Sequence, residues 1–352
     1  MATVRDIARS IGVSPATVSR SLNKPSVVRK DIRDQVVAEA RRMGYEVKRR
    51  RTRHGMIGML FYNASSGLPF SGYDAVIWSG VTRAAISNKH GIGVFDPSTR
   101  HHNESFADFA ERLGVDGFIV RVDQDTRHVC EELADESVPH VVVADRFEKP
   151  GVSYASCNSY DASYAAIKHL VNLGHRRIGL SHNFVLDTDH HDRIRAYRAM
   201  LADAGLETSD DLVVPVAGDM RGGASALNQL MSLPDPPTAI FFTDPQLTAA
   251  ALRRSLEVGI RVPDELSIVG IDDEHLRELT YPVYTAVCQE AEKLAYQASR
   301  WLCQTLGDAD HRGVFNEALR LEAEAVLEVN QTTAPPPAEP ARLTPGGERI
   351  RA

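Results

Sequence analysis

The chain has 352 residues, of which 43% are hydrophobic and 25% are charged, as is ordinary for globular proteins. That length exceeds what one hydrophobic core usually serves, so we expect two or three folding units. No window approaches the roughly 18 apolar residues of a membrane helix, and the polar N-terminus does not resemble a secretory signal. The four cysteines form no CxxC pair, which favours reduced thiols over a zinc site. We therefore expect a cytoplasmic protein.

Positive charge is concentrated at the N-terminal end. Residues 1–54 contain 14 Lys and Arg against 5 Asp and Glu, a net charge of +9. Because the whole chain carries −7, the remainder carries −16. A basic end on an acidic body indicates that one end of the molecule contacts a polyanion and the other does not.

Three short helices are predicted in the basic end. The first spans about Val4–Ile11, and Gly12 ends it because glycine adopts the left-handed conformation of a C-cap at almost no cost. Ser14 then offers an N-cap oxygen, and Pro15 suits the first position of a second helix that continues to Leu22. The residues of this second helix that we expect to point outward are Ala16, Thr17 and Arg20.

The third predicted helix spans about Lys30–Met43. Its inner face is expected to consist of Ile32, Val36, Val37 and Ala40. Basic three-helix units also serve as protein-binding modules, and that alternative stays open. The coincidence of caps, turn glycine and outward basic residues favours a helix-turn-helix.

Residues 3–47 carry a long and specific pattern. Within TVRDIARSIGVSPATVSRSLNKPSVVRKDIRDQVVAEARRMGYEV lies the run A-x-x-x-G-V-S-x-x-T-V-S-R-x-L-N. This stretch closely resembles the DNA-binding headpiece of the lactose-repressor/galactose-repressor (LacI/GalR) family of bacterial transcriptional regulators. The resemblance implies base reading in the major groove by Pro15, Ala16 and Arg20, with Arg20 gripping a guanine edge. It implies phosphate contacts from Thr3, Ser14, Thr17, Ser19 and Asn23.

The segment after the headpiece departs from the family pattern. Tyr45 is followed by EVKRRRTRHG, which is shorter than the usual linker and lacks the leucine that wedges into the minor groove. What remains is a cationic strap suited to phosphates or a narrow minor groove, in which we single out Arg49, Arg50 and Arg51. A solvated linker that contacts nothing is the alternative.

From residue 56 the chain alternates apolar runs of strand length with stretches of helix length. The strand-like runs are 56–62, 91–95, 117–120, 140–144, 177–180, 212–216, 239–242 and 266–271. The helix-length segments include 76–88, 160–173, 193–204 and 248–258. This alternation predicts parallel, doubly wound α/β sheets covered on both faces, divided between two lobes.

The family resemblance extends to about residue 333 and implies a periplasmic-binding-protein-like core that closes on a small molecule. The landmarks are GVDGFIV (114–120), VPHVVVADR (138–146), NLGHRRIGL (172–180), PDELSIVGIDD (263–273) and TAVCQ (285–289). We expect a helix-turn-helix domain at 1–46, a short basic linker at 47–55, a core at 56–330 and a disordered Pro-rich tail at 331–352. The expected N-lobe comprises about 56–156 and 290–316, and the expected C-lobe about 157–289 and 317–330.

Six residues are carried over as candidate effector contacts. They are Tyr73, Asp145, Arg193, Met220, Asp272 and Gln289. Carboxylates accept hydroxyl hydrogen bonds and a guanidinium donates them, which suits a polyhydroxylated ligand such as a sugar. For each residue, a surface salt bridge or a strand-end cap is the alternative. Met220 stands where the family often has an aromatic residue and Cys157 where it often has Asp, so the effector cannot be copied from a relative.

The stretch 182–193, HNFVLDTDHHDR, holds three histidines and three aspartates. A metal site is one interpretation, but adjacent His190 and His191 would point different ways, which favours the polar, ligand-facing start of a helix. We therefore expect neither metal nor cofactor. The tail lacks leucine heptads, which argues against a tetramerising coiled coil and leaves a homodimer as the expected assembly.

Three kinds of function compete. A repressor controlled by a small-molecule effector and bound as a dimer to a near-palindromic DNA operator fits the headpiece and the core together. An enzyme on a doubly wound sheet lacks support, because the chain has no G-x-G-x-x-G, P-loop or G-x-S-x-G motif and offers no catalytic residues. A transport-type binding protein does not explain the basic headpiece. DNA binding that ignores any metabolite is a fourth possibility.

Overall fold

The computed structural model describes residues 3–23, 28–43, 45, 55–61, 72–122, 126–184, 186–206, 208–273, 276–307 and 318–350. They fall into two compact units, the N-terminal headpiece and a core that begins at Gly55. None of the described helices is both long and apolar enough to cross a bilayer.

The headpiece consists of three helices around a small apolar centre. They are α1 (Val4–Ile11), α2 (Pro15–Asn23) and α3 (Lys30–Arg42). The side chains buried between them are Ile7, Ala8, Val18, Leu22, Val36 and Ala40. These bounds and inner faces confirm the sequence prediction except at Val37, which is 37% exposed. Val37 follows Val36 by one position, and a helix turns neighbouring side chains about 100° apart, so only one of the two faces the centre.

The N-lobe of the core is built on a six-stranded, fully parallel sheet in the order β11-β5-β4-β3-β1-β2. Its strands are β1 (Met56–Leu60), β2 (Gly91–Phe95), β3 (Gly117–Val120), β4 (His140–Val143), β5 (Tyr154–Asn158) and β11 (Arg320–Glu324). Its helices are α4 (Gly72–Ser87), α5 (Phe106–Leu113), α6 (His128–Asp135) and α11 (Ala291–Gly307), with a short 3₁₀ turn at Pro97–Thr99.

The C-lobe repeats the plan with the order β12-β10-β9-β8-β6-β7, in which only β12 runs antiparallel to its neighbour. Its strands are β6 (Ile178–Asn183), β7 (Val213–Val216), β8 (Ala239–Phe242), β9 (Ser267–Asp272), β10 (Thr285–Cys288) and β12 (Val326–Glu328). Its helices are α7 (Tyr160–Leu173), α8 (Thr188–Asp203), α9 (Met220–Met231) and α10 (Pro245–Val258), with 3₁₀ turns at Asp210–Leu212 and Leu276–Leu279.

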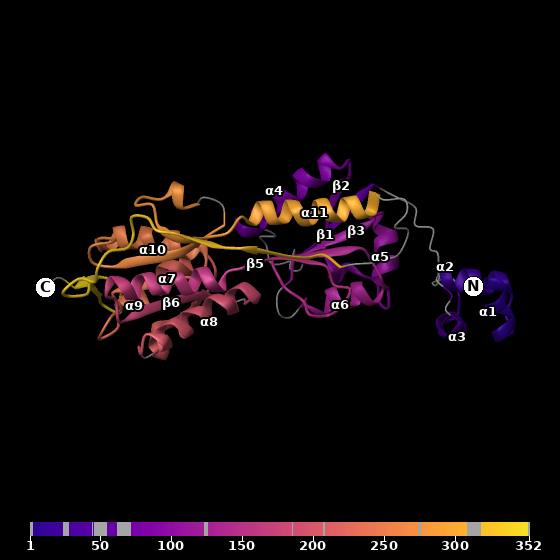
Figure 1. Ribbon diagram of the computed structural model, residues 1–352, viewed down its shortest axis with the longest axis horizontal. Coiled ribbons are helices and arrows are strands. Elements are labelled where there is room, and N and C mark those ends of the chain that lie inside the picture. The colour runs from indigo at the N-terminus through magenta and orange to yellow at the C-terminus, as the bar shows by residue number, and fades with distance from the viewer. Residues whose placement is uncertain are drawn as a thin grey trace. The chain divides into compact units, whose positions relative to one another are not determined.

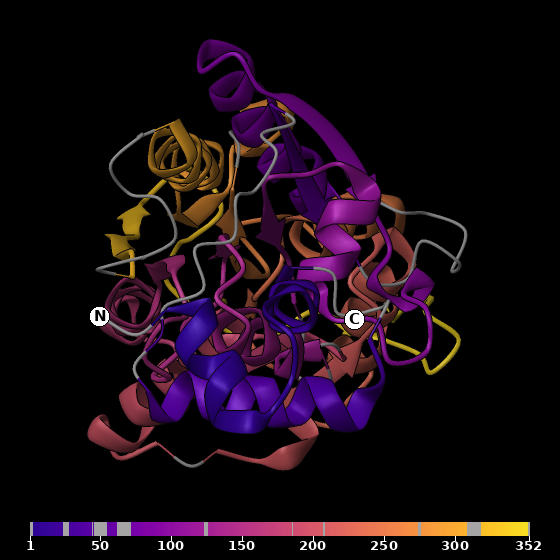
Figure 2. The same cartoon turned by 90° about the vertical axis from the view of Figure 1, so that its right-hand side faces the viewer.

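Helices cover both faces of each sheet (Figures 1 and 2). In the N-lobe, α4 and α11 pack on one face and α5 and α6 on the other. Helices α4 and α11 lie side by side, and they approach closely at Gly80. A Cβ atom there would lie 2.2 Å from the carbonyl oxygen of Glu292, so the contact requires glycine. In the C-lobe, α7 and α8 cover one face, and α9 and α10 cover the other.

The chain crosses between the lobes three times, after β5, after β10 and between β11 and β12. The first and third crossings touch, because the Ala325 amide donates to the Asn158 carbonyl over 3.1 Å. The predicted assignment of 317–330 to the C-lobe is therefore wrong in part, since β11 pairs with β5 in the N-lobe sheet. Its alternating, half-exposed sequence RLEAE is typical of an edge strand, which sequence alone does not allot to either lobe.

The prediction of a disordered tail is also wrong. Thr332 is fully buried, accepts a hydrogen bond from the Thr285 amide and donates one to the Ile268 carbonyl. Beyond it, β13 (Arg342–Leu343) and β14 (Arg349–Ile350) form a small hairpin. Leu343 enters the C-lobe core, and Arg349 reaches Glu265 over 2.6 Å. The Pro-rich composition predicted disorder, but the contacts of Thr332, Leu343 and Arg349 hold this segment against the C-lobe.

Candidate functional site

The α2 helix of the headpiece presents its N-terminal residues outward. Gly12 adopts φ 71° and allows the chain to turn between α1 and α2. The Ser14 hydroxyl accepts the Thr17 amide over 3.0 Å, as an N-cap does, and its oxygen lies 2.8 Å from the Thr17 hydroxyl. Pro15, Ala16 and Arg20 are exposed on the surface of α2, which confirms the predicted outward orientation of Ala16 and Arg20, whereas Thr17 is half-buried.

Other predicted DNA contacts have different surroundings. Thr3 forms a capping box with Asp6 at the start of α1: its hydroxyl donates to Asp6 and accepts the Asp6 amide. Thr17 and Ser19 are half-buried. Asn23 ends α2, but its side chain lies outside the described residues, as do Arg49, Arg50 and Arg51.

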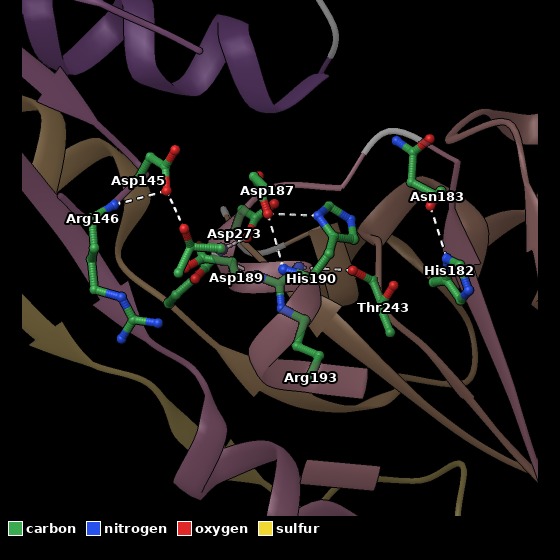
Figure 3. Close-up of polar contacts among 12 residues, drawn as sticks. Asp145, Arg146, His182, Asn183, Asp187, Asp189, His190, Arg193, Thr243 and Asp273 are labelled. Atoms are coloured by element: carbon green, nitrogen blue, oxygen red, sulfur yellow. Dashed lines mark hydrogen bonds and ion pairs between the residues drawn. The ribbon is translucent and has the colours of Figure 1, made fainter. Parts of the chain in front are cut away.

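In the core, a line of polar contacts joins the two lobes. Asp145 and Arg146 follow β4 of the N-lobe, and both reach the first turns of α8 in the C-lobe (Figure 3). The Thr188 hydroxyl donates to Asp145, and the Arg146 guanidinium pairs with Asp192. These contacts hold the end of β4 against the start of α8.

The start of α8 carries three further polar side chains. Asp187 is the N-cap and accepts the His190 amide over 2.9 Å. The same oxygen lies 2.7 Å from His190 Nδ1, so the imidazole carries its hydrogen on that nitrogen. Asp189 follows in the first turn and is 2% exposed. The predicted polar start of a helix in 182–193 is confirmed.

Arg193 lies one turn further along α8 and connects this helix to the sheet. Its Nη1 donates to the Thr243 carbonyl over 2.8 Å, and its Nη2 lies 3.8 Å from Asp189. Asp273, directly after β9, accepts a hydrogen bond from the Gln289 side chain and faces Arg193 electrostatically. Figure 3 shows Asp189, Arg193, Thr243 and Asp273 gathered in one place.

Several of these buried groups have atoms without a hydrogen-bond partner. They are Asp189 Oδ1, His190 Nε2, Arg193 Nε, Thr243 Oγ1 and Gln289 Oε1, on residues that are each at most 8% exposed. Buried polar atoms are normally satisfied, and an unmet group of this kind costs about 1–3 kcal/mol. Other such atoms lie elsewhere in the chain, but these five belong to neighbouring side chains at the start of α8 and beside the second crossing, which makes this group the candidate polar ligand site. We call Asp187, Asp189, His190, Arg193, Thr243, Asp273 and Gln289 the cleft cluster.

Burial and neighbouring charges shift the pKa values of the three carboxyl groups in the cleft cluster. Burial, followed by the neighbouring Asp187 charge, raises the pKa of Asp189. Burial raises the pKa of Asp273 to about 7, although Arg193 opposes the shift. Burial alone would raise the pKa of Asp187 as well, but His190 and Arg193 bring it below its ordinary value. The site therefore contains carboxylates that are costly to ionise together.

Two predicted effector residues, Asp145 and Asp272, have hydrogen-bond and ion-pair partners within the chain. The Asp145 carboxylate is engaged by Arg127, Thr188 and the Arg146 amide. Asp272 accepts the Leu276 amide over 2.9 Å and pairs with Arg277. Its neighbour Asp273, which sequence reasoning missed, is the carboxylate that joins the cleft cluster. Side chains alternate along a strand, so one of two adjacent aspartates had to face away.

Of the two remaining predicted effector residues, Tyr73 lies near the cleft cluster and Met220 does not contact it. Tyr73 starts α4 and lines a small pocket with Cys157 and Gln289. Burial raises the pKa of Tyr73, with Asp189 and Asp273 contributing, which places its hydroxyl near the cleft cluster. Met220 begins α9 and is 43% exposed, and no described contact brings it to the cluster.

No group of three or more metal-ligating side chains is found in the part of the chain that the structure describes. The aspartates of 182–193 have other partners: Asp187 caps α8, and Asp192 pairs with Arg146 and Arg195.

The chain carries a helix-turn-helix headpiece and a two-lobed core, and each of them matches a known protein family. Residues 3–47 match the lacI family of bacterial regulatory proteins, and residues 167–324 match the periplasmic binding protein-like domain.

The headpiece is a LacI-family DNA-binding domain. Among the relatives of the whole chain is the HTH-type transcriptional repressor PurR of Haemophilus influenzae (strain PittEE), 28% identical over 88% of this chain and 93% of the relative. PurR of Mannheimia succiniciproducens is 26% identical over 93% of this chain and 98% of the relative.

Solved structures of transcriptional regulators are also similar to this chain. A transcriptional regulator CelR–cellobiose complex is 26% identical, with a TM-score of 0.67 over 94% of this chain and 100% of the other. A LacI-family regulator from Mycobacterium smegmatis is 27% identical, with a TM-score of 0.61 over 80% of this chain and 99% of the other. This protein is therefore a DNA-binding transcriptional regulator with an effector-binding core, and its relatives are repressors rather than enzymes.

Proposed function

We propose that this regulator is a dimeric repressor whose operator affinity is set by a carbohydrate-like effector bound in the cleft cluster. The observation that carries the proposal is the set of unpartnered, buried polar atoms between the lobes, on the same chain as an exposed DNA-reading helix. Cellobiose, which the CelR structure contains, is a ligand of the chemistry that such atoms accept. Its place of action is the bacterial nucleoid, in the cytoplasm.

In this proposal, α2 enters the major groove with Pro15, Ala16 and Arg20 at the base edges. Arg20 is exposed and donates two hydrogen bonds to a guanine, whereas Pro15 and Ala16 offer apolar contact. Thr3, Ser14, Thr17, Ser19 and Asn23 position the headpiece on phosphates. The hydroxyls of Thr3 and Ser14 also hold the helix caps, so their amides and the helix N-termini carry part of that role.

Effector binding is proposed to act through lobe closure. A ligand that hydrogen-bonds to Arg193, Gln289 and Tyr73 together bridges α8, the second crossing and α4. It thereby strengthens the closed arrangement that the Asp145–Thr188 and Arg146–Asp192 contacts hold. In a two-fold dimer, that arrangement sets the spacing of the two headpieces on a near-palindromic operator.

Gel-shift titration of the full-length protein on the DNA upstream of its own gene tests the repressor. We expect a specific complex at low ionic strength, with two protomers bound and an affinity that a metabolite changes at least about 5-fold. A complex no tighter than that with random DNA of equal length contradicts the proposal. A specific complex that no metabolite alters would favour effector-independent binding instead.

The basic linker is proposed to contact phosphates through Arg49, Arg50 and Arg51. Replacing all three with serine should weaken binding to every sequence and flatten the dependence of log affinity on log salt by about 0.9 per lost contact. Anisotropy titrations between about 50 and 200 mM salt measure the slope. A slope equal to that of the wild type would assign the arginines to a linker that touches nothing.

A further inference from the structure

The cleft cluster contains more carboxylates than cations. Four arginines lie near the lobe boundary, but three already have an acidic partner. Arg121 lies 3.4 Å from Asp74, Arg127 pairs with Asp145, and Arg146 pairs with Asp192. Arg193 is left facing Asp187, Asp189 and Asp273, and its nearest carboxylate contact is the loose 3.8 Å approach to Asp189.

The unpartnered atoms are also rich in hydrogen-bond acceptors. Gln289 Oε1 only accepts, Asp189 Oδ1 accepts when the carboxylate is ionised, and His190 Nε2 accepts in the ring form whose single hydrogen lies on Nδ1 and faces Asp187. Arg193 Nε is the fixed donor among the five atoms, and the Thr243 hydroxyl serves in either role. A ligand that satisfies this set supplies O–H or N–H groups rather than oxygens that only accept.

The start of α8 also disfavours ligands that carry a negative charge. The N-terminus of a helix of this length normally attracts anions through its free amides and dipole. Here the chain's own acids take that place: Asp187 accepts the His190 amide, and Asp189 stands in the first turn. The feature that would most readily hold a ligand carboxylate or phosphate is therefore already neutralised from within.

We propose that the cleft selects hydroxyl-rich ligands without negative charge over sugar acids and sugar phosphates, and that Asp189 sets this selectivity. The inference rests on the proposed function, because it takes the cleft cluster as the effector site. Asp189 is singled out among the three carboxylates because Asp187 is engaged by His190 and Asp273 by Gln289, whereas Asp189 retains a buried oxygen with no partner.

Calorimetric titration of the full-length regulator with matched sugars at pH 8, above the raised pKa of Asp189, tests the selectivity. The probes are cellobiose, glucose, glucosamine, glucuronate and glucose 6-phosphate, with the galactose, mannose and ribose series in parallel. We expect neutral or amino members to bind and the acid or phosphate analogue of each binder to be at least about 100-fold weaker, because like charges at about 4 Å repel strongly inside a protein. A sugar acid or phosphate that binds as tightly as its neutral parent overturns the proposal.

The Asp189→Asn variant tests the assigned residue, because it keeps the shape and an acceptor oxygen while removing the charge. We expect it to narrow the ratio between neutral and acidic ligands at least about 10-fold, mainly by improving the acid. Asp161→Asn is the matched control, since Asp161 is an exposed acid in the first turn of the neighbouring helix α7. An unchanged ratio in Asp189→Asn, with operator binding intact, removes Asp189 from the role.

The two proposals fail in different ways. If a sugar phosphate or acid binds best and alters operator affinity, the effector-controlled repressor stands and the charge selectivity is wrong. If no probe of any charge binds, the carbohydrate-like effector and the selectivity inferred from it both fall. The gel shift on upstream DNA is independent of either result.

Discussion

The headpiece and the core use charge in opposite ways. The headpiece and linker carry a net +9 over residues 1–54, and Arg20 on α2 is exposed, available to a partner that arrives from solvent. The core concentrates acids where solvent cannot reach them, at 2% exposure for Asp189 and 8% for Asp273. An exposed charged side chain loses little hydration, and its presence can be inferred from the sequence. The effect of a buried charged side chain depends on the groups around it, which only the structure shows. The difference is that between a surface built for a polyanion and a pocket that rejects anions.

The largest expected effect tests the buried side of this comparison. Arg193→Met removes the guanidinium that faces Asp187, Asp189 and Asp273 and breaks its hydrogen bond to the Thr243 carbonyl. Leaving buried carboxylates without their cation should lower the free energy of unfolding by about 3–5 kcal/mol. Urea denaturation of wild type and variant at pH 7.5 measures the difference. A loss of less than about 1 kcal/mol would mean that the acids are not held by Arg193.

The exposed side is tested by Arg20→Ala. Because Arg20 is the proposed guanine contact, the variant should lose about 1–3 kcal/mol of operator binding and accept other bases at one position of each half-site. Binding-site selection followed by sequencing measures the preference. Arg9→Ala is the control, since Arg9 is an exposed arginine on α1 rather than α2. Identical base preferences in the Arg20 variant and the wild type would count against direct readout.

A smaller effect concerns the pH dependence of stability. A carboxyl group whose folded pKa is raised binds more protons when folded than when unfolded, so its contribution to stability falls as pH rises from about 4 to about 7. Buried histidines such as His175 and His182, whose pKa values burial lowers, produce the opposite slope below about pH 6.5. The comparison of Asp273→Asn with wild type cancels the histidines.

Relative to the wild type, Asp273→Asn should gain on the order of 1–2 kcal/mol of stability between pH 5 and pH 8. Thermal unfolding monitored by circular dichroism across this range measures the gain. If the difference between the two proteins is the same at both ends of the range, Asp273 titrates as an ordinary carboxyl group and the strained cleft is wrong.

The sequence predicts the strands and helices that a local residue pattern determines. It does not predict those whose burial or pairing depends on neighbouring segments. The strands at 117–120 and 239–242 and the helix at 160–173 were predictable because continuous apolar runs and helical periodicity mark buried elements. Strand β5, with the sequence YASCN, lacks such a run and is buried by its surroundings. The sequence also gives no sign of which crossing an edge strand such as β11 will follow.

The site was predictable as a region and less so as a set of residues. The structure brings the predicted residues Arg193 and Gln289 into the cleft cluster and Tyr73 near it, and their contact with an effector stays a prediction. The structure pairs the predicted Asp272 with the Leu276 amide and Arg277 and leaves Asp273 in the cleft cluster, a difference of strand-end geometry that the sequence does not reveal. Asp145 was correctly placed after β4, but its partners Arg127 and Thr188 come from distant segments.

The most direct test of the account is a single titration of the full-length regulator against its own upstream DNA, with and without the neutral sugar panel. We expect a dimer on one near-palindromic site, bound at least about 1,000-fold more tightly than random DNA, and we expect a non-anionic sugar to change that affinity at least about 5-fold. Binding that is equal on upstream and random DNA, with every sugar tested, would contradict it.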